Sequence, residues 1–479
     1  MRITRITLKD FMAFKGECTI DLKAGCNLLL YGENGSGKSS LFQALTCFFA
    51  PDTPFGDHKN IFVTTDDGFV KLEIGDGTNP SKTYEWETTT HPFTEPLIVE
   101  TSKTKGFLDY RSLLETHFVH RHTDSVNAFD LLVNSLLVNA QNPLTRSTLG
   151  EEWRHIQDLV AQRRGSRRNS RLDEAISDFN AGLTQLLGDL SSKSNEILAL
   201  FEQNVTVQLA FAGQGLQVAS AGRHVENRTV ALTAEYYGRA VSRHHHFLNE
   251  ARLSAIAVSI YLSALLLNPP SQLRVLFLDD VLIGLDMSNR LPLLGILQRF
   301  FADWQVILAT YDRVWFDMVW QRGKDMGSWQ RGELFCCSDG QCDVPVYKGN
   351  GDYLAVATKH LDSGDLKAAA IYIRSAYELV IKRFCDRHHL AVRYCEKPKD
   401  QRSEDFWQVV KARKLGTGAD LLDAELVSDV ELFRSTVLNQ LSHTAPVSLV
   451  RKEVEEAHKA VESLTHRLHQ VKECKLKKA

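Results

Sequence analysis

One eight-residue segment constrains the fold of this chain more than any other feature of its sequence. Gly32-Glu-Asn-Gly-Ser-Gly-Lys-Ser39 matches the pattern G-x-x-x-x-G-K-[ST] at every fixed position. The segment follows the apolar run 27–31 and precedes the helix-forming residues 41–45. A strand, a glycine-rich loop and a helix in this order are typical of phosphate-binding α/β proteins. We therefore expect an α/β fold for the first part of the chain.

The same loop has the chemistry of a phosphate site. Glycines let backbone N–H groups converge on phosphate oxygens, and a helix that starts at the loop favours negative charge there. Lys38 supplies a cation for the β and γ phosphates, and the Ser39 hydroxyl can ligate Mg²⁺. ATP and Mg²⁺ are the expected cofactors. The predicted nucleotide-binding residues of the loop are Gly32, Glu33, Asn34, Gly35, Ser36, Gly37, Lys38, Ser39 and Ser40.

A second segment supplies carboxylates. Residues 275–278 read as a buried strand that ends in Asp279 and Asp280. We expect Asp279 to hold Mg²⁺ through water, and Asp280 to act as a base or to position the attacking water. Two acids follow a strand fairly often by chance, but their pairing with a complete phosphate loop favours the functional interpretation.

At 479 residues the chain is too long for one ordinary domain. Residues 1–145 and 204–345 are predicted to form the two parts of one nucleotide-binding domain, because strand patterns occupy both. Between them, residues 146–203 carry apolar side chains at helical spacing, and we expect a helical hairpin insertion whose tip is the arginine-rich segment 163–171. Residues 350–479 read as a separate helical domain.

Composition limits the class of protein. A formal net charge of −3 provides no global basic field, so any nucleic-acid contact must be a local patch such as 163–171. Met1 opens directly on a strand pattern without a signal peptide. The apolar run 253–267 is shorter than the ~20 residues that a membrane-spanning helix needs, so it is predicted to be a buried helix.

The cysteines favour a reducing compartment. There are nine, an odd number, and they are scattered along the chain, which does not suggest a disulfide framework. Cys336, Cys337 and Cys342 flank an Asp339-Gly340 turn, and we interpret them as part of a β-hairpin rather than a zinc site, because no second ligand pair follows. These features together predict a cytoplasmic protein.

The motifs resemble those of ABC-type ATPases of the SMC/RecF/RecN group over about residues 1–320. The segment from Leu278 to Asp286 is similar to that group's Walker B motif and D-loop, and Phe247-Leu-Asn-Glu-Ala-Arg-Leu-Ser254 resembles a degenerate signature motif. The resemblance implies that Asn249 and Asp286 help to bind nucleotide. Asn249 would contact the γ-phosphate of ATP held by a second subunit, so the site would be completed in a dimer or higher oligomer.

Three departures from that group concern turnover. Asp280 stands where the group usually has a glutamate, so hydrolysis is expected to be slow, and the signature lacks Ser-Gly-Gly. Tyr311, within Thr310-Tyr311-Asp312, stands where a switch histidine is usual and is therefore a candidate catalytic residue. No Q-loop glutamine can be assigned; residues 117–122 are the expected region. The histidines there and at 244–246 are predicted to be solvated or structural rather than metal ligands.

The C-terminal region offers a second candidate site. Arg374 and Glu378 lie four residues apart on one predicted helix, and His443 follows in a later helical stretch. An arginine, a glutamate and a histidine would suffice for metal-free RNA cleavage through the ribose 2′-OH. The arrangement resembles HEPN-like nuclease domains behind ABC ATPases in bacterial anticodon nucleases of the PrrC and RloC type. The alternative is an i,i+4 ion pair with a helix-capping histidine.

The sequence therefore predicts an α/β protein: an ABC-type P-loop ATPase head with a short helical-hairpin insertion and a C-terminal all-α domain. Its function is expected to be ATP-dependent control of an effector in bacterial antiphage defence, either its own nuclease or a separate nuclease subunit, as in the PARIS system. An SMC/RecF-like DNA-binding ATPase in repair or chromosome maintenance is the alternative. Expected partners are a second copy of the chain, an effector subunit, and tRNA or DNA, but no membrane.

Overall fold

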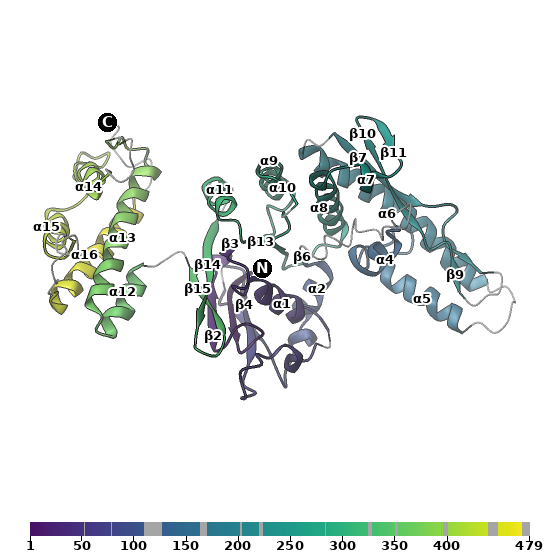
Figure 1. Ribbon diagram of the computed structural model, residues 1–479, viewed down its shortest axis with the longest axis horizontal. Coiled ribbons are helices and arrows are strands. Elements are labelled where there is room, and N and C mark those ends of the chain that lie inside the picture. Colours follow the sequence, from purple (N-terminus) through teal and green to yellow (C-terminus); the bar gives the residue numbers. More distant parts are fainter. Residues whose placement is uncertain are drawn as a thin grey trace. The chain divides into compact units, whose positions relative to one another are not determined.

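The chain forms two compact units, Met1–Gly349 and Asn350–Ala479 (Figure 1). Each has its own hydrophobic core, and each is described separately below. The computed structural model describes residues 1–51, 53–77, 79–109, 127–162, 170–201, 204–219, 224–282, 284–323, 328–349, 353–393, 395, 401–438 and 449–471.

A six-stranded sheet is the centre of the first unit. Its strand order is β15-β14-β3-β13-β12-β6, all neighbours are parallel except the β14–β15 hairpin, and β3 carries the phosphate loop at its end. Its central strands are apolar along their length because both faces are covered. The strands are β3 Asn27–Gly32, β6 Gly106–Asp109, β12 Val275–Asp279, β13 Gln305–Thr310, β14 Trp329–Ser338 and β15 Asp343–Gly349.

One face of this sheet packs against helix α1 (Lys38–Phe48) and an antiparallel sheet of order β2-β1-β4-β5. Alternate residues of β12 divide between two cores: Val275 and Phe277 enter the core with α1, and Leu276 and Leu278 enter the core on the opposite face. The remaining elements on the α1 side are β1 Arg2–Lys9, β2 Glu17–Asp21, β4 Phe69–Gly75, β5 Lys82–Glu87, α2 Pro96–Thr104 and the 3₁₀ turns Lys23–Gly25, Phe55–His58 and Pro92–Thr94.

The opposite face packs against helices that include the inserted region. Helix α5 (Leu149–Ala161) begins at a capping box made by Thr148 and Glu151, and it packs along α6 (Ser170–Leu200) (Figure 1). The strand β7 (Val205–Phe211) pairs with β10 (Val230–Tyr236) in a separate three-stranded sheet of order β11-β10-β7, and β7 packs on α6. Of the predicted hairpin tip, 163–171, residues 163–169 lie outside the described residues, and residues 170 and 171 begin α6.

Helix α8 (Glu250–Leu267) is the most apolar helix of this unit. By length and composition it could cross a membrane, but 72% of its apolar window is buried inside the unit, so it serves as a core helix. The remaining elements are the α-helix α4 (Phe129–Leu131) with the π-helix Leu132–Leu136, the strands β8 (Gln217–Val218), β9 (Val225–Glu226) and β11 (Arg239–Val241), and the helices α7 (His244–Phe247), α9 (Met287–Arg290), α10 (Pro292–Phe300) and α11 (Arg313–Gly323).

The regular elements among the described residues of the second unit are helices, joined by loops that include one isolated β-bridge, Lys414–Asp420. Its core is built from apolar faces of five α-helices and includes Trp407 and Tyr377, both fully buried. The helices are α12 Tyr353–Asp362, α13 Leu366–Arg387, α14 Ser403–Lys411, α15 Ala424–Phe433, the π-helix Arg434–Leu438, and α16 Arg451–His469. The predicted fold class, an α/β unit followed by C-terminal helices, is confirmed.

Candidate functional site

The phosphate loop bridges β3 and α1 as its motif predicts. Gly35 and Gly37 have φ angles of 86° and 96°, which only glycine adopts without strain. Space also requires glycine at position 37, since a Cβ there would lie 2.7 Å from Cγ of Pro345 on β15. Gly37 is the N-cap of α1, and no side chain caps that helix. The N–H groups of its first turn are therefore left for a ligand, and this geometry suits an anion.

Lys38 lies at the centre of the loop and is only 5% exposed. Its Nζ donates to the carbonyl oxygen of Gly32 at 2.7 Å and to that of Glu33 at 3.2 Å. The ammonium also lies 3.5 Å from Oδ2 of Asp280, the carboxylate after β12. The cation is thus held against the loop backbone at the start of α1, a position from which it can reach phosphates bound there.

Ser39, in the first turn of α1, is in contact with Asp279, at the end of β12. The Ser39 hydroxyl donates to Oδ2 of Asp279 at 3.0 Å, while Oδ1 of Asp279 is buried and has no hydrogen-bond partner among the residues that the structure describes. Burial, with a contribution from the neighbouring Asp280 carboxylate, raises the pKa of Asp279 to about 6. A buried carboxylate oxygen without a donor is costly unless a cation is provided. Ser39 and Asp279 are hard oxygen ligands, so this pair fits Mg²⁺.

Asp280 is held in an unusual backbone conformation, with φ at 51°. Its N–H donates to Ala309 at 3.2 Å, and its Oδ1 accepts the N–H of Tyr311 at 3.0 Å, so both contacts come from the end of β13. Burial raises its pKa, against the opposing effect of the Lys38 cation. The carboxylate is therefore fixed beside the phosphate loop, where it can orient a water molecule.

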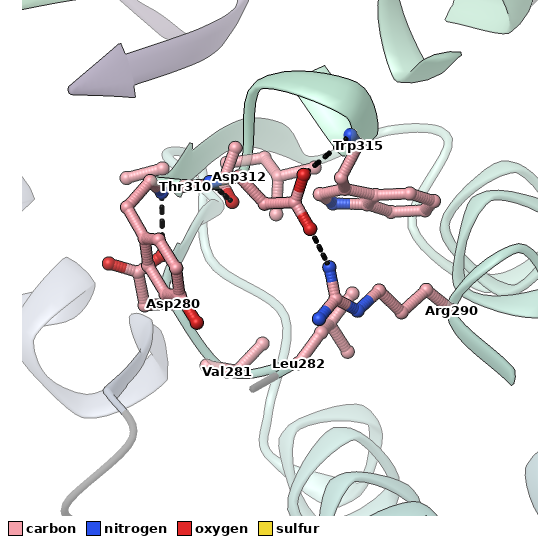
Figure 2. A pocket seen from close by; sticks show the side chains of 10 residues that line it. Asp280, Val281, Leu282, Arg290, Thr310, Asp312 and Trp315 are labelled. Carbon is pink, nitrogen blue, oxygen red and sulfur yellow. Dashed lines mark hydrogen bonds and ion pairs between the residues drawn. The ribbon is translucent and has the colours of Figure 1, made fainter. Parts of the chain in front are cut away.

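Figure 2 shows the small pocket behind Asp280. Arg290 donates to Oδ2 of Asp312 at 2.6 Å, and Oδ1 of Asp312 accepts the N–H groups of Val314 and Trp315 at the start of α11. Hydrogen bonds from Arg290 and from these N–H groups lower the pKa of Asp312 despite its partial burial. The segment after β13 is thus tied to the segment after β12.

Three other predicted residues have different surroundings. Tyr311 contacts Asp280 through its backbone N–H, and its side chain is 38% exposed. Asn249 and Asp286 are exposed N-caps: Asn249 accepts the N–H of Arg252, and Asp286 accepts that of Asn289, each at 3.0 Å. Within this chain these two side chains cap α8 and α9.

The tertiary structure adds Asp109, which sequence reasoning missed. Asp109 ends β6 and is the register partner of Asp279 in the neighbouring parallel strand. Register partners point to the same face of a sheet, and Phe107 and Phe277 show that this is the α1 face. The Asp109 charge contributes to the raised pKa of Asp279. The only signal in the sequence is an acid at the end of the four-residue strand 106–109, which is too short to stand out.

The C-terminal candidate is seen in part. Arg374 and Glu378 form an i,i+4 ion pair on α13 at 3.1 Å, and Glu378 also lies 3.7 Å from Lys382. His443 lies outside the described residues, as do the expected Q-loop region 117–122 and residues 163–169 of the arginine-rich segment. Among described residues, no group of three or more His, Cys, Asp or Glu side chains is arranged to hold a metal ion, and the described cysteines, including those of the β14–β15 hairpin, are free thiols.

Comparison with known protein families finds a match within the unit Met1–Gly349. Residues 5–204 match the family model described as AAA domain. No curated protein matches the chain. The matched residues 5–204, which contain the phosphate loop, are therefore similar to an AAA domain.

Solved structures that match include three SMC head domains. An SMC head bound to the C-winged-helix domain of ScpA is 12% identical, with 74% of this chain and 100% of that chain covered and a TM-score of 0.42. A Pyrococcus furiosus SMC head with an extended coiled coil, bound to the C-terminal domain of ScpA, is 11% identical, with 76% and 99% covered and a TM-score of 0.42. The Thermotoga maritima SMC head domain is 12% identical, with 73% and 100% covered and a TM-score of 0.36.

Proposed function

We propose that this chain is a cytoplasmic, Mg²⁺-dependent ATPase in which the nucleotide state of the Met1–Gly349 unit controls the action of the helical unit. One observation carries the ATPase proposal. Lys38, Ser39, Asp279 and Asp280 converge on the N-terminus of α1, and within the described part of the chain the buried Oδ1 of Asp279 has no hydrogen-bond partner. This combination supplies a phosphate cation, two cation ligands and a carboxylate for water within one site.

Each residue has a distinct role in this proposal. The loop N–H groups and the Lys38 ammonium bind the phosphates, and the carbonyl contacts of Lys38 give way to phosphate oxygens. Ser39 and Asp279 would hold Mg²⁺, which neutralises phosphate charge when it is bound with ATP. Asp280 orients the attacking water. Its position is set by the N–H of Tyr311, so the segment after β13 positions the catalytic carboxylate.

A second copy of the chain completes the site in this proposal. Asn249 and Asp286 are exposed at the N-termini of α8 and α9. The ABC-type resemblance of both segments supports their contact with nucleotide on a partner copy. The site would then be composite, and ATP would hold the copies together.

The helical unit, Asn350–Ala479, is proposed to be the effector or its docking site in bacterial antiphage defence. The resemblance of Arg374, Glu378 and His443 to HEPN-like nucleases supports an ATP-gated anticodon nuclease. A docking module for a separate nuclease is the second form of the proposal. The alternative function is that of an SMC/RecF-like DNA-binding ATPase in repair. It would use the same ATPase site, but its ligand would be DNA.

Two assays with matched variants test this proposal. ATP hydrolysis should require Lys38 and Asp280, and an activity that survives both substitutions would refute the assigned site. tRNA cleavage in the presence of ATP should be lost in His443→Ala and Arg374→Ala, with ATPase activity retained. Arg451→Ala is the matched control because it removes another i,i+4 ion pair, Arg451–Glu455 at 2.8 Å, from the same unit. Intact tRNA with the parental protein would favour the docking module, and duplex DNA binding would favour the repair ATPase.

A further inference from the structure

We propose that a hollow next to the start of α8 binds single-stranded nucleic acid. The hairpin of β10 and β11 forms one wall, and α7 with its flanking residues forms the other. The hollow is open to solvent and has a volume of about 700 Å³, within the range of small-molecule sites. Aromatic rings and basic groups that line it come from Tyr236, Tyr237, Arg239, Arg243, His246 and Phe247.

Two of the rings are unusually exposed. Tyr237 is 66% exposed and Phe247 is 64% exposed, so neither ring contributes to the hydrophobic core. Tyr236 lies between them, with ring centroids 4.7 Å from Tyr237 and 6.0 Å from Phe247. Arg252 holds Tyr236 in place, since its guanidinium lies 4.7 Å from that ring and donates to its hydroxyl at 3.1 Å. The two exposed rings therefore both contact the Tyr236 ring, whose position is fixed by Arg252.

The backbone pays a conformational cost to present Tyr237. Tyr236 pairs with Arg239 across a two-residue turn, and both turn residues, Tyr237 and Gly238, have positive φ, at 50° and 71°. Such a turn favours asparagine or glycine at its first position, and a bulky residue there is strained. A hydrogen bond to the Tyr237 hydroxyl from Asn204, at 3.1 Å, offsets part of this strain. Because the ring is exposed, burial does not compensate for the remaining strain. We therefore attribute the position of the Tyr237 ring to ligand binding.

The charge of the hollow fits a phosphate backbone. Its described lining includes two arginines and a histidine but no carboxylate; the nearest acids in sequence, Glu235 and Glu250, are not part of the lining. Planar rings next to guanidinium groups recognise a base and its phosphate together. Bases in a duplex are already stacked on each other, so exposed rings favour unpaired bases. The hollow therefore fits single strands better than duplex DNA.

The test is fluorescence anisotropy with a labelled dT20 oligonucleotide and its duplex, using the full chain. Tyr237→Asn is the most informative variant, because asparagine tolerates positive φ; its melting temperature should not fall. We expect Tyr237→Asn and Phe247→Ala each to weaken dT20 binding at least about fivefold, since base stacking of ~1 kcal/mol corresponds to that factor. The plot of log K against log salt concentration has a negative slope, and Arg239→Ala should make that slope less steep by about 0.7.

Two variants in the helical unit are matched controls: Leu432→Ala removes a side chain that is 55% exposed, and Arg451→Ala removes an exposed arginine. Both should bind dT20 as the parental protein does. Parental protein that does not bind dT20, or that binds the duplex as tightly, overturns the proposal. So does unchanged dT20 affinity in both ring variants. If those variants instead weaken only ATP-dependent self-association, the hollow holds the base of a nucleotide on a second copy and the single-strand assignment is wrong.

Discussion

At the scale of single residues, the candidate site depends on buried charges. The Lys38 ammonium is buried against two loop carbonyl groups and the Asp280 carboxylate, and Asp279 has one buried carboxylate oxygen with no donor among the described residues. Both situations cost free energy in the absence of ligand, and ATP with its cation would relieve both. The residue-scale predictions follow from this shared dependence on phosphate and metal.

Lys38→Ala should weaken ATP binding by tenfold or more, because a charge-assisted contact to phosphate contributes roughly 1.5–3 kcal/mol. Isothermal titration calorimetry measures this directly. Lys348→Ala, on β15, is a suitable control, because it removes a lysine that does not line the loop and should leave the affinity unchanged. Equal affinity in the parental protein and Lys38→Ala would show that the loop does not bind the phosphates.

Asp280→Asn should retain ATP but hydrolyse it about a hundredfold more slowly, the range expected when a positioned proton acceptor is lost. Asparagine tolerates the positive φ at this position, so the turn itself should persist. ATP affinity serves as the internal control, and single-turnover hydrolysis is the measurement. An unchanged rate would move the water-positioning role to another group.

At the scale of secondary-structure elements, the short edge strand β6 brings a third carboxylate to the site. Asp109→Asn should weaken Mn²⁺ binding to the ADP-loaded protein by about tenfold, as loss of an outer-shell metal partner typically does. Electron paramagnetic resonance reports Mn²⁺ binding without relying on turnover. Asp303→Asn, an exposed acid paired with Arg274, is the control. Unchanged Mn²⁺ affinity in Asp109→Asn would show that Asp109 takes no part in metal binding and that β6 has only a structural role.

Helix α1 ends next to a partly buried lysine, which makes stability depend on pH. Lys105 donates to the carbonyl oxygen of Phe49 at 2.7 Å, and burial lowers its pKa to about 8. Between pH 8 and its ordinary pKa near 10.5, the unfolded chain keeps a proton that the folded chain has released, so rising pH stabilises the fold. Relative to Lys105→Met, the free energy of unfolding should rise across this window, by no more than ~1.4 kcal/mol per pH unit.

Below pH 8 both states of Lys105 are protonated, and the difference between the two proteins should be constant. Denaturant unfolding at several pH values from 7 to 10 gives the comparison, and other titrating groups cancel because both proteins share them. A flat difference over the whole range would mean that Lys105 keeps an ordinary pKa in the folded chain.

At the scale of the whole molecule, the two units have separate cores and should respond separately to core substitutions. Phe384→Ala in α13, where the ring is 2% exposed, should destabilise the helical unit by about 3–5 kcal/mol, and Leu278→Ala in β12 should destabilise the first unit by about 2–5 kcal/mol. Calorimetry should show a different transition shifted in each variant. ATP affinity should persist in Phe384→Ala. A single transition lowered equally by both substitutions would show that the units fold as one.

The sequence alone determined the features that depend on a contiguous segment. The phosphate loop could be predicted because its glycine conformations, its cation and its helix start all lie within residues 32–39. The strand at 275–279 with its terminal acids was equally local, as was the helical character of residues after 350. Local geometry decides these features, so the motif and the apolar period were sufficient to find them.

Only the tertiary structure decided the features that join distant segments. It pairs β7 with β10 in a separate sheet, although the sequence of residues 205–211 shows only that they form a strand. It places Asp109 beside Asp279, 170 positions later in the chain, through the register of β6 and β12. It also ties Arg290 to Asp312 and gathers two exposed rings around Tyr236. Strand partners and side-chain neighbours are chosen by packing across the whole unit, so no local pattern encodes them.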